Sequence, residues 1–146
     1  MEGADWVAWC DGSAVPNPGR MGLGAVLIAP DGTRHALSQA THTIGCNNEA
    51  ELRALMAAAG EARARGATTL QVYSDNSVVV AQLRDASAEP IARLAPLFDE
   101  ARMLLNGFDR VAVAWVPRHR NREADVLARK ALGMAPKAVT KPWKRR

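Results

Sequence analysis

The stretch Thr69-Leu-Gln-Val-Tyr-Ser-Asp-Asn-Ser77 decides the fold of this chain. Its first six residues include β-branched and aromatic side chains and run into a polar cluster, which predicts a β-strand over Thr69–Ser74. We expect a helix from Ser77 to Leu83 and a later strand from Val111 to Val116. Strands that alternate with helices in this way indicate parallel pairing, and hence a fold of the α/β class.

Upstream of this unit, the chain has the pattern of an antiparallel meander. Apolar runs predict strands over Trp6–Cys10, Gly22–Ala29 and Arg34–Thr43. The loop Val15–Gly19, with two prolines, separates the first two strands, and Pro30-Asp31-Gly32-Thr33 is a strong hairpin signal between the last two. Three antiparallel strands therefore precede the parallel part of the fold.

Three more helices are predicted from apolar residues at helical spacing. They lie over Asn48–Gly66, within Ala88–Gly107 and over Asn121–Leu132, the last with Asn121 as its expected N-cap. A chain of 146 residues with this single series of elements suits one domain, which we place at residues 1–132. Residues 133–146 carry basic clusters without a core pattern, so we expect a flexible basic tail there.

Bulk properties favour a cytoplasmic location. Cys10 and Cys46 are too few and too far apart for a disulfide framework or a zinc site, and we expect reduced thiols. No apolar stretch approaches the roughly 20 residues that span a bilayer, and Met1–Asp5 lacks the features of a signal peptide. We therefore expect a cytoplasmic monomer without membrane association.

The charge of the chain is unevenly placed. From Trp115 to the C-terminus there are ten Lys or Arg residues and two acids, whereas the preceding part has nine Lys or Arg residues and thirteen acids. A basic end behind an acidic body predicts a polyanionic partner, and nucleic acid fits best if acidic metal ligands lie elsewhere in the chain. The alternative is a solvated terminus that only aids solubility.

Four carboxylates stand where a predicted strand ends or a predicted helix begins: Asp11, Glu51, Asp75 and Asp125. The first three follow or adjoin apolar runs, where a buried carboxylate is costly unless a cation or hydrogen bonds compensate its charge. Four hard oxygen donors with little else suit Mg²⁺ or Mn²⁺. Such a set predicts a hydrolase that cleaves phosphodiesters with two metal ions.

Three of these carboxylates also have ordinary structural interpretations. Asp11 could hydrogen-bond within its own turn, although Gly12-Ser13 would let a ligand approach the backbone closely. Asp75 could cap the helix that follows it, a role that its polar neighbours can fill instead. Asp125 could pair with Arg129, four residues later on the same helix.

Glu51 has to be distinguished from Glu49. If Asn48 is the N-cap of its helix, Glu51 occupies the third helical position and could form a variant of the capping box. Glu49 is spaced to pair with Arg53, which describes a solvated ion pair on the helix surface. Glu51 instead lies beside the apolar stripe and is predicted to point toward the sheet, so we favour Glu51 as the metal ligand.

The order of these motifs resembles the type 1 ribonuclease H family from about Trp6 to Leu132. The matching stretches are Asp11-Gly12-Ser13 with Asn17-Pro18-Gly19, Asn47-Asn48-Glu49-Ala50-Glu51-Leu52, Tyr73-Ser74-Asp75-Asn76-Ser77, and Trp115-Val116-Pro117 followed by Asn121-Arg122-Glu123-Ala124-Asp125-Val126-Leu127-Ala128. The resemblance implies a five-stranded mixed sheet flanked by helices. Its first three strands would be antiparallel, and its fourth and fifth parallel to the first.

The resemblance also implies a function. A protein of this family cleaves the RNA strand of an RNA–DNA hybrid and leaves 3′-hydroxyl and 5′-phosphate ends. Asp11, Glu51, Asp75 and Asp125 match the family's ligands of two Mg²⁺ ions, which Mn²⁺ can replace. The expected substrate-binding residues are Gly12, Ser13, Asn17, Asn47 and Asn48.

The chain departs from the family in three places. The segment Ser87–Asp109 is short and mostly apolar or acidic, so the basic protrusion that grips the DNA strand in many members is expected to be absent. The basic tail is then a candidate for gripping the substrate. Ile44 and Cys46 occupy positions where the family's phosphate pocket commonly has other residues. His119 is a candidate auxiliary catalytic residue, or else a surface histidine in a basic loop.

Two other functions are compatible with these motifs. One keeps the fold and the chemistry but has a different or broader RNA substrate, such as double-stranded RNA. The other is a non-catalytic nucleic-acid-binding module, which the four carboxylates disfavour because they would repel phosphates. Trp6, Trp9 and Trp115 fall in predicted strands, and we expect them in the core or on a sheet face rather than stacked on bases.

Deletion of residues 137–146 tests the role of the basic tail. It removes five positive charges and Trp143, and it should leave the melting temperature nearly unchanged because the segment has no core pattern. Affinity for nucleic acid should fall, and the slope of log K against log salt should become shallower by up to ~0.9 per lost phosphate contact. Equal affinities and salt slopes for the full and shortened chains would identify a tail that only aids solubility.

Overall fold

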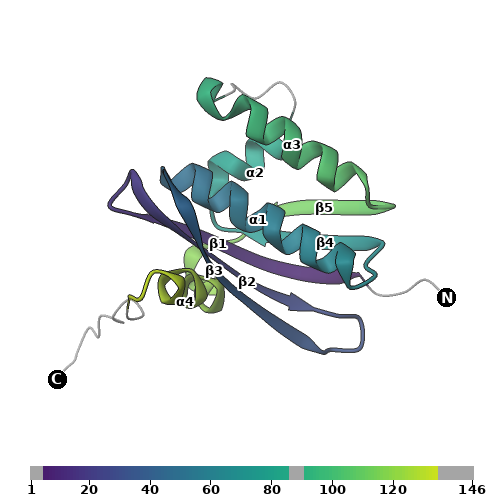
Figure 1. The fold of residues 1–146 in the computed structure, drawn as a ribbon. Coiled ribbons are helices and arrows are strands. Elements are labelled where there is room, and N and C mark those ends of the chain that lie inside the picture. Colours follow the sequence, from purple (N-terminus) through teal and green to yellow (C-terminus); the bar gives the residue numbers. More distant parts are fainter. Residues whose placement is uncertain (1–4, 86–90, 135–146) are drawn as a thin grey trace.

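The computed structural model describes residues 5–85 and 91–134 of the chain. Within these residues the strands are β1 (Trp6–Val15), β2 (Gly19–Ile28), β3 (Arg34–Gly45), β4 (Thr69–Ser74) and β5 (Arg110–Trp115). The α-helices are α1 (Asn47–Ala64), α2 (Ser77–Arg84), α3 (Ala95–Asn106) and α4 (Arg122–Ala131), with short 3-10 turns at η1 (Ala92–Leu94) and η2 (Arg118–Arg120). Figure 1 shows their arrangement around one sheet.

The strands form a single mixed sheet in the order β3-β2-β1-β4-β5. The pairs β1–β2 and β2–β3 are antiparallel, whereas β1–β4 and β4–β5 are parallel. The sequence prediction of a mixed α/β fold, with an antiparallel meander followed by parallel strands, is therefore confirmed. Strand β1 is central, and its pairing with β4 stops at Cys10, whereas its pairing with β2 continues to Val15.

The larger core lies between the sheet and α1. Alternate residues of the strands, among them Ala8 of β1 and Leu70 of β4, pack in one cluster with Leu55 of the helix. Most of the helix residues in this contact are alanines, and these are Ala54, Ala58, Ala59 and Ala62. Because alanine side chains are small, the helix axis can lie close to the sheet, and this closeness sets the position of every side chain that α1 carries.

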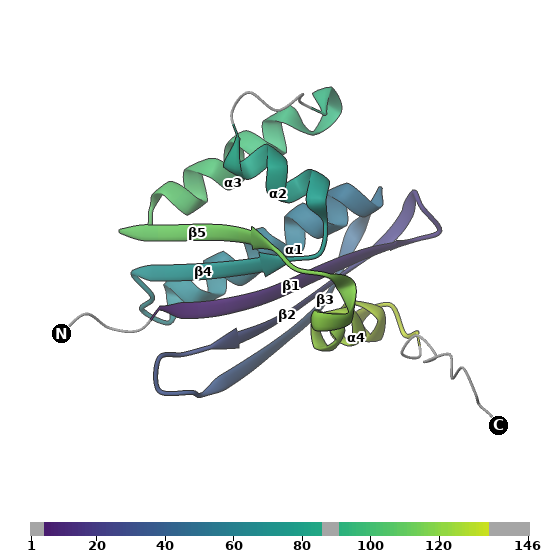
Figure 2. The same ribbon diagram turned by 180° about the vertical axis from the view of Figure 1, so that it is seen from behind.

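The opposite face of the sheet carries α4, on the other side from α1 (Figures 1 and 2). This helix contacts β2 through glycines. A β-carbon at Gly24 would lie 2.3 Å from the Ala124 oxygen and 2.4 Å from the Ala128 nitrogen, and one at Gly22 would lie 2.3 Å from the Ala128 oxygen. The two backbones are thus in direct contact, which fixes the position of Asp125 within α4.

Several element boundaries differ from the prediction by a few residues, and two of these differences bear on the site. Strand β1 continues to Val15 rather than ending at Cys10, because its pairing with β2 runs on to Arg20. Helix α1 begins at Asn47 and not at Asn48, since Cys46 is its N-cap: the Cys46 sulfur accepts from the Glu49 backbone N–H at 3.4 Å. The capping-box alternative for Glu51 is therefore wrong.

The described residues bear on two further expectations. Between α2 and β5 they form η1 and α3, which agrees with a chain that lacks the basic protrusion. No helix among residues 5–85 and 91–134 is both long and apolar enough to cross a membrane. The prediction of a flexible tail falls almost entirely on residues 135–146, which lie outside the described residues.

The glycine contact between α4 and β2 gives a stability prediction. Gly24→Ala should lower the free energy of unfolding by about 1–3 kcal/mol, because its β-carbon meets only backbone atoms and α4 has to shift. Gly60→Ala is the matched control: its β-carbon meets nothing within 4 Å, and alanine favours a helix by roughly 0.5–1 kcal/mol. Urea denaturation measures both, and equal stability of Gly24→Ala and the unaltered chain would contradict the contact.

Candidate active site

Asp11 and Asp75 are brought together by the parallel pairing of β1 with β4. The register pairs Cys10 with Ser74, so the residue that follows each of them lies at the same edge of the sheet. Asp11 is only 5% exposed, even though it carries a carboxylate. Asp75 is not needed as a helix cap, since the Asn76 side chain caps α2 by accepting from the Val79 N–H at 3.0 Å.

Glu51 reaches the same place from α1. The Gly12 backbone N–H donates to the Glu51 carboxylate at 3.0 Å. This bond depends on a close approach of helix and strand, because a β-carbon at Gly12 would lie 2.2 Å from the Ala50 carbonyl group. Glycine at this position therefore has a structural reason: any side chain would push α1 away from β1, and Glu51 with it.

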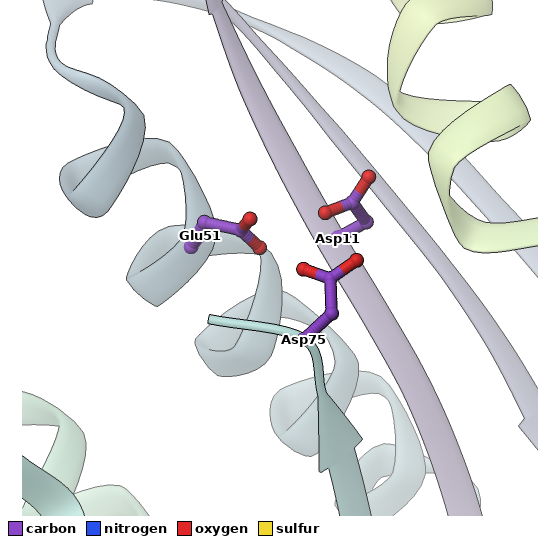
Figure 3. A group of neighbouring side chains, drawn as sticks. All are labelled: Asp11, Glu51 and Asp75. Atoms are coloured by element: carbon purple, nitrogen blue, oxygen red, sulfur yellow. The ribbon is translucent and has the colours of Figure 1, made fainter. Parts of the chain in front are cut away.

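These three carboxylates converge at one point (Figure 3). One ligand atom from each of Asp11, Glu51 and Asp75 lies within 4.8 Å of the others. Three buried or half-buried carboxylates at that separation repel one another, and a divalent cation with oxygen ligands relieves the repulsion. The donor set therefore fits Mg²⁺ or Mn²⁺, as the sequence predicts.

Asp125 faces the same cavity but is not a member of this three-carboxylate group. It lines one open pocket, here called the carboxylate pocket, together with Asp11, Gly12, Ser13, Asn47, Asn48, Glu51, Asp75, Asn76, Ser77, Arg118 and Arg129. An Asp125 oxygen lies 4.0 Å from Nε of Arg129, whose side chain is mostly buried. The ion pair expected from their spacing is thus present, and it places a cation inside the pocket.

The carboxylate cluster shifts the pKa values of its members upward. Burial, and then the charge of Asp75, raise the pKa of Asp11 from 3.8 to about 8. Burial and the neighbouring Asp11 raise the pKa of Glu51 well above its ordinary value. Burial also raises the pKa of Asp75, although a hydrogen bond from Asn121 and the charge of Arg118 oppose this rise. Without a cation, these groups hold protons that ordinary carboxyls release.

Comparison with known proteins agrees with this geometry. Residues 9–131 match the family described as reverse transcriptase-like. The crystal structure of RNase H1 from Halobacterium salinarum NRC-1 has a TM-score of 0.83 and 34% sequence identity, covering 89% of this chain and 98% of that one. The chain belongs to the ribonuclease H-like family. The family and fold expected from the motif order are therefore confirmed.

Two further similarities show the extent of the match. Bifunctional protein Rv2228c of Mycobacterium tuberculosis is 36% identical over 131 residues, which are 88% of this chain and 36% of that protein. Ribonuclease HI of Halobacterium salinarum is 37% identical over 129 residues, 86% of this chain and 63% of that protein. LC11-RNase H1, solved in complex with an RNA/DNA hybrid, shares the fold at a TM-score of 0.80 and 24% identity. The chain thus spans only part of the length of Rv2228c and of the Halobacterium Ribonuclease HI.

The expected substrate-binding residues of this ribonuclease H-like chain form a hydrogen-bonded group. Asn47 accepts from the Ala14 N–H at 2.8 Å through its side-chain oxygen, and Asn48 accepts in the same way from the Asn76 side chain at 2.8 Å. Asn17 accepts from the Asn47 N–H at 3.0 Å and does not line the carboxylate pocket. Within the described part of the chain, the side-chain N–H groups of Asn47 and Asn48 make no hydrogen bond and can donate to a ligand, whereas Asn17 accepts from the backbone of Asn47.

The structure places Arg118, and not His119, in the carboxylate pocket. Both residues belong to the exposed turn η2 that follows β5. Asn121, expected as a helix cap, makes no side-chain capping bond; its amide donates to the Cys10 carbonyl at 2.8 Å, which ties the start of α4 to β1. The sequence pattern gave no signal for Arg118 or for this role of Asn121, because both depend on the direction of the chain after β5.

The positions of the family's phosphate pocket are occupied differently, as the sequence indicates. Ile44 is 67% exposed. Cys46 caps α1, and its sulfur also accepts from the Arg93 guanidinium at 3.4 Å. Burial opposes ionisation of Cys46, but the Glu49 N–H and Arg93 outweigh it and lower the pKa of the thiol.

Glu51 and Glu49 form a matched pair for testing the site. Glu51→Gln should weaken Mn²⁺ binding by more than the 10–100-fold typical of losing a supporting partner, while its amide oxygen can still accept from Gly12. Glu49→Gln should change Mn²⁺ affinity little, because the Glu49 carboxylate is paired with Arg53 at 2.8 Å. The side chain of Glu49 is only 17% exposed, so this pair is less solvated than the sequence predicts. Titration calorimetry measures both, and the reverse order would assign the ligand to Glu49.

The raised pKa of Asp11 predicts a pH-dependent stability in metal-free protein. The pKa of Asp11 is about 8 in the folded state and 3.8 in an ordinary carboxyl, so the folded state binds this proton more tightly. The resulting stabilisation is fully present below pH ~4 and is lost as the pH rises through 8. Asn is uncharged throughout, so Asp11→Asn should gain stability over the unaltered chain between these pH values. Denaturation with a chelator at pH 5 and pH 8 measures this, and a difference independent of pH would contradict the raised pKa.

Proposed function

We propose that this chain is a metal-dependent endoribonuclease that cleaves the RNA strand of RNA–DNA hybrids and leaves 5′-phosphate and 3′-hydroxyl ends. The observation that carries the proposal is the convergence of Asp11, Glu51 and Asp75 within 4.8 Å, from three different elements, in one open pocket. Membership of the ribonuclease H-like family supports the substrate class, and the name Ribonuclease HI of a relative that is 37% identical supports the reaction.

The four carboxylates are the groups that would hold the metal. Asp11, Glu51 and Asp75 are already close enough for one ion, and Asp125 lines the same pocket, near enough to Asp11 to contribute to the rise of its pKa. Their oxygens favour Mg²⁺, with Mn²⁺ as a substitute. When bound, two such ions supply an activated water and stabilise the leaving 3′-oxygen. The raised pKa values of Asp11 and Glu51 support the same assignment, because a bound cation would take the place of their protons.

The remaining polar groups of the carboxylate pocket are suited to an RNA strand. Arg118 and Arg129 are cations that can neutralise phosphate charge next to the metal ligands. The free amide groups of Asn47 and Asn48 can donate to the 2′-hydroxyl, which distinguishes RNA from DNA. Gly12 and Ser13 line the same pocket beside these groups.

A cleavage assay with three duplexes tests the proposal. End-labelled RNA–DNA hybrid, double-stranded RNA and double-stranded DNA are incubated with the protein and Mg²⁺, and the product ends are mapped. We expect cleavage of the RNA strand in the hybrid, and a loss of at least about 100-fold in Asp75→Asn with hybrid binding retained. Cleavage of double-stranded RNA at a similar rate would broaden the substrate class, and binding without any cleavage would establish a non-catalytic module.

His119 gives a further prediction for the reaction. His119→Ala should lower turnover by roughly tenfold or less, below the ~10²–10⁴-fold contribution of an essential acid or base, because His119 does not line the pocket. Arg118→Ala should cost more, because Arg118 does line it. Turnover at saturating hybrid compares the two variants, and complete loss with His119→Ala but intact metal binding would place His119 at the centre of the chemistry.

A further inference from the structure

Trp115 is exposed beside the carboxylate pocket. It is the last residue of β5, and 51% of its surface is accessible, so of the two expected positions, core or sheet face, the core is excluded. Its indole N–H donates to the backbone carbonyl of Asp75 at 3.2 Å. The indole N–H is therefore held next to Asp75, while about half of the surface of the residue stays accessible to a ligand.

The surroundings of Trp115 are cationic. The next turn, η2, consists of Arg118, His119 and Arg120, all exposed, and Arg118 also lines the carboxylate pocket. Among residues 5–85 and 91–134, the stacked ring pairs are Trp9 with Tyr73 and Trp6 with His35, and neither includes Trp115. An exposed aromatic ring beside exposed basic side chains is a pattern typical of surfaces that contact nucleic acid.

We propose that Trp115 contacts the sugar–phosphate backbone of the substrate next to the cleaved bond, with the indole face against a sugar and Arg118 toward the adjoining phosphate. This inference rests on the proposed function, since it takes the nucleic acid to lie in the carboxylate pocket. It adds a substrate contact that lies outside the carboxylates and the asparagine group.

The chemistry of the ring selects the sugar as its partner. The bases of a paired hybrid face one another and stack within the duplex, so a protein surface at the backbone meets sugars and phosphates. The only hydrogen-bond donor of the indole is already bonded to Asp75, which leaves an apolar face for the carbon-bound hydrogens of a sugar. Backbone contacts of this kind fix the register of a duplex. Trp115 should therefore affect binding and the choice of cleavage position more than the chemical step.

Introduction of a negative charge by Trp115→Glu tests the contact, with Met103→Glu as the matched control. Met103 is 75% exposed on α3 and does not line the carboxylate pocket. Fluorescence anisotropy with a labelled hybrid, in the full chain carrying Asp11→Asn, measures the Kd. We expect Trp115→Glu to raise the Kd by roughly tenfold or more, because it removes the contact and adds a charge that repels phosphate. Trp115→Phe, which keeps a flat apolar ring, and Met103→Glu should stay within about threefold of the reference.

Steady-state cleavage then separates a substrate contact from support of Asp75. For a substrate contact, KM for hybrid rises in Trp115→Glu, the mapped cleavage positions change, and the half-maximal Mg²⁺ concentration stays the same. An unchanged Kd, or a changed Mg²⁺ requirement with an unchanged KM, overturns the inference and leaves Trp115 a structural support. If Trp115→Glu melts far below the unaltered chain, Trp115→Leu is compared with Trp115→Phe: weaker binding by Leu supports the contact, and equal binding overturns it.

The outcome for Trp115 is separate from that for the proposed function. If the unaltered chain fails to cleave the hybrid, the proposed function fails, whatever the Kd values show. If it cleaves the hybrid but Trp115→Glu binds as tightly as Met103→Glu, only the Trp115 contact fails.

Discussion

The contact between α1 and β1 at Gly12 is the constraint on which the site depends. The helix backbone at Ala50 occupies the space that any side chain at position 12 would need. The same closeness lets the Gly12 N–H donate to the Glu51 carboxylate, and this hydrogen bond holds the carboxylate near Asp11. Packing and chemistry are thus coupled: the small alanine side chains of α1 let the helix lie near the sheet, and this closeness brings Glu51, a candidate metal ligand, to Asp11 and Asp75.

That arrangement has an electrostatic cost in the absence of metal. Carboxylates gathered in a protein interior repel one another and lose hydration, as the upward pKa shifts of Asp11, Glu51 and Asp75 show. The fold holds them together regardless: the register of β1 with β4 places Asp11 next to Asp75, and the packing of α1 against Gly12 places Glu51. Clusters of like charge that lower the stability of the fold are common at functional sites, because the function requires those groups to be close together.

Much of the fold, and the meeting of three carboxylates in the candidate site, could be predicted because both follow from local patterns. Runs of apolar residues located the strands, and the ends of those runs located Asp11 and Asp75. The sequence pattern gives no prediction where the role of a residue depends on packing against residues far away in the chain. Arg118 enters the pocket, and Trp115 remains exposed, only because of the path of the chain between β5 and α4. Cys46 caps α1 in place of the predicted Asn48, whose side-chain oxygen accepts from Asn76 beyond β4 instead.

The docking of α4 on glycines of β2 has a consequence for the nascent chain. Every strand of the sheet precedes α4 in the sequence, so a ribosome completes the sheet and the three-carboxylate group before it makes Asp125. Domains generally acquire structure from the N-terminus during synthesis. The fourth carboxylate then arrives as a separate step, when Gly22 and Gly24 receive the last helix and Asn121 bonds the Cys10 carbonyl. A chain that ended before α4 would contain every strand and three of the four carboxylates, but it would lack the last member of the candidate metal site.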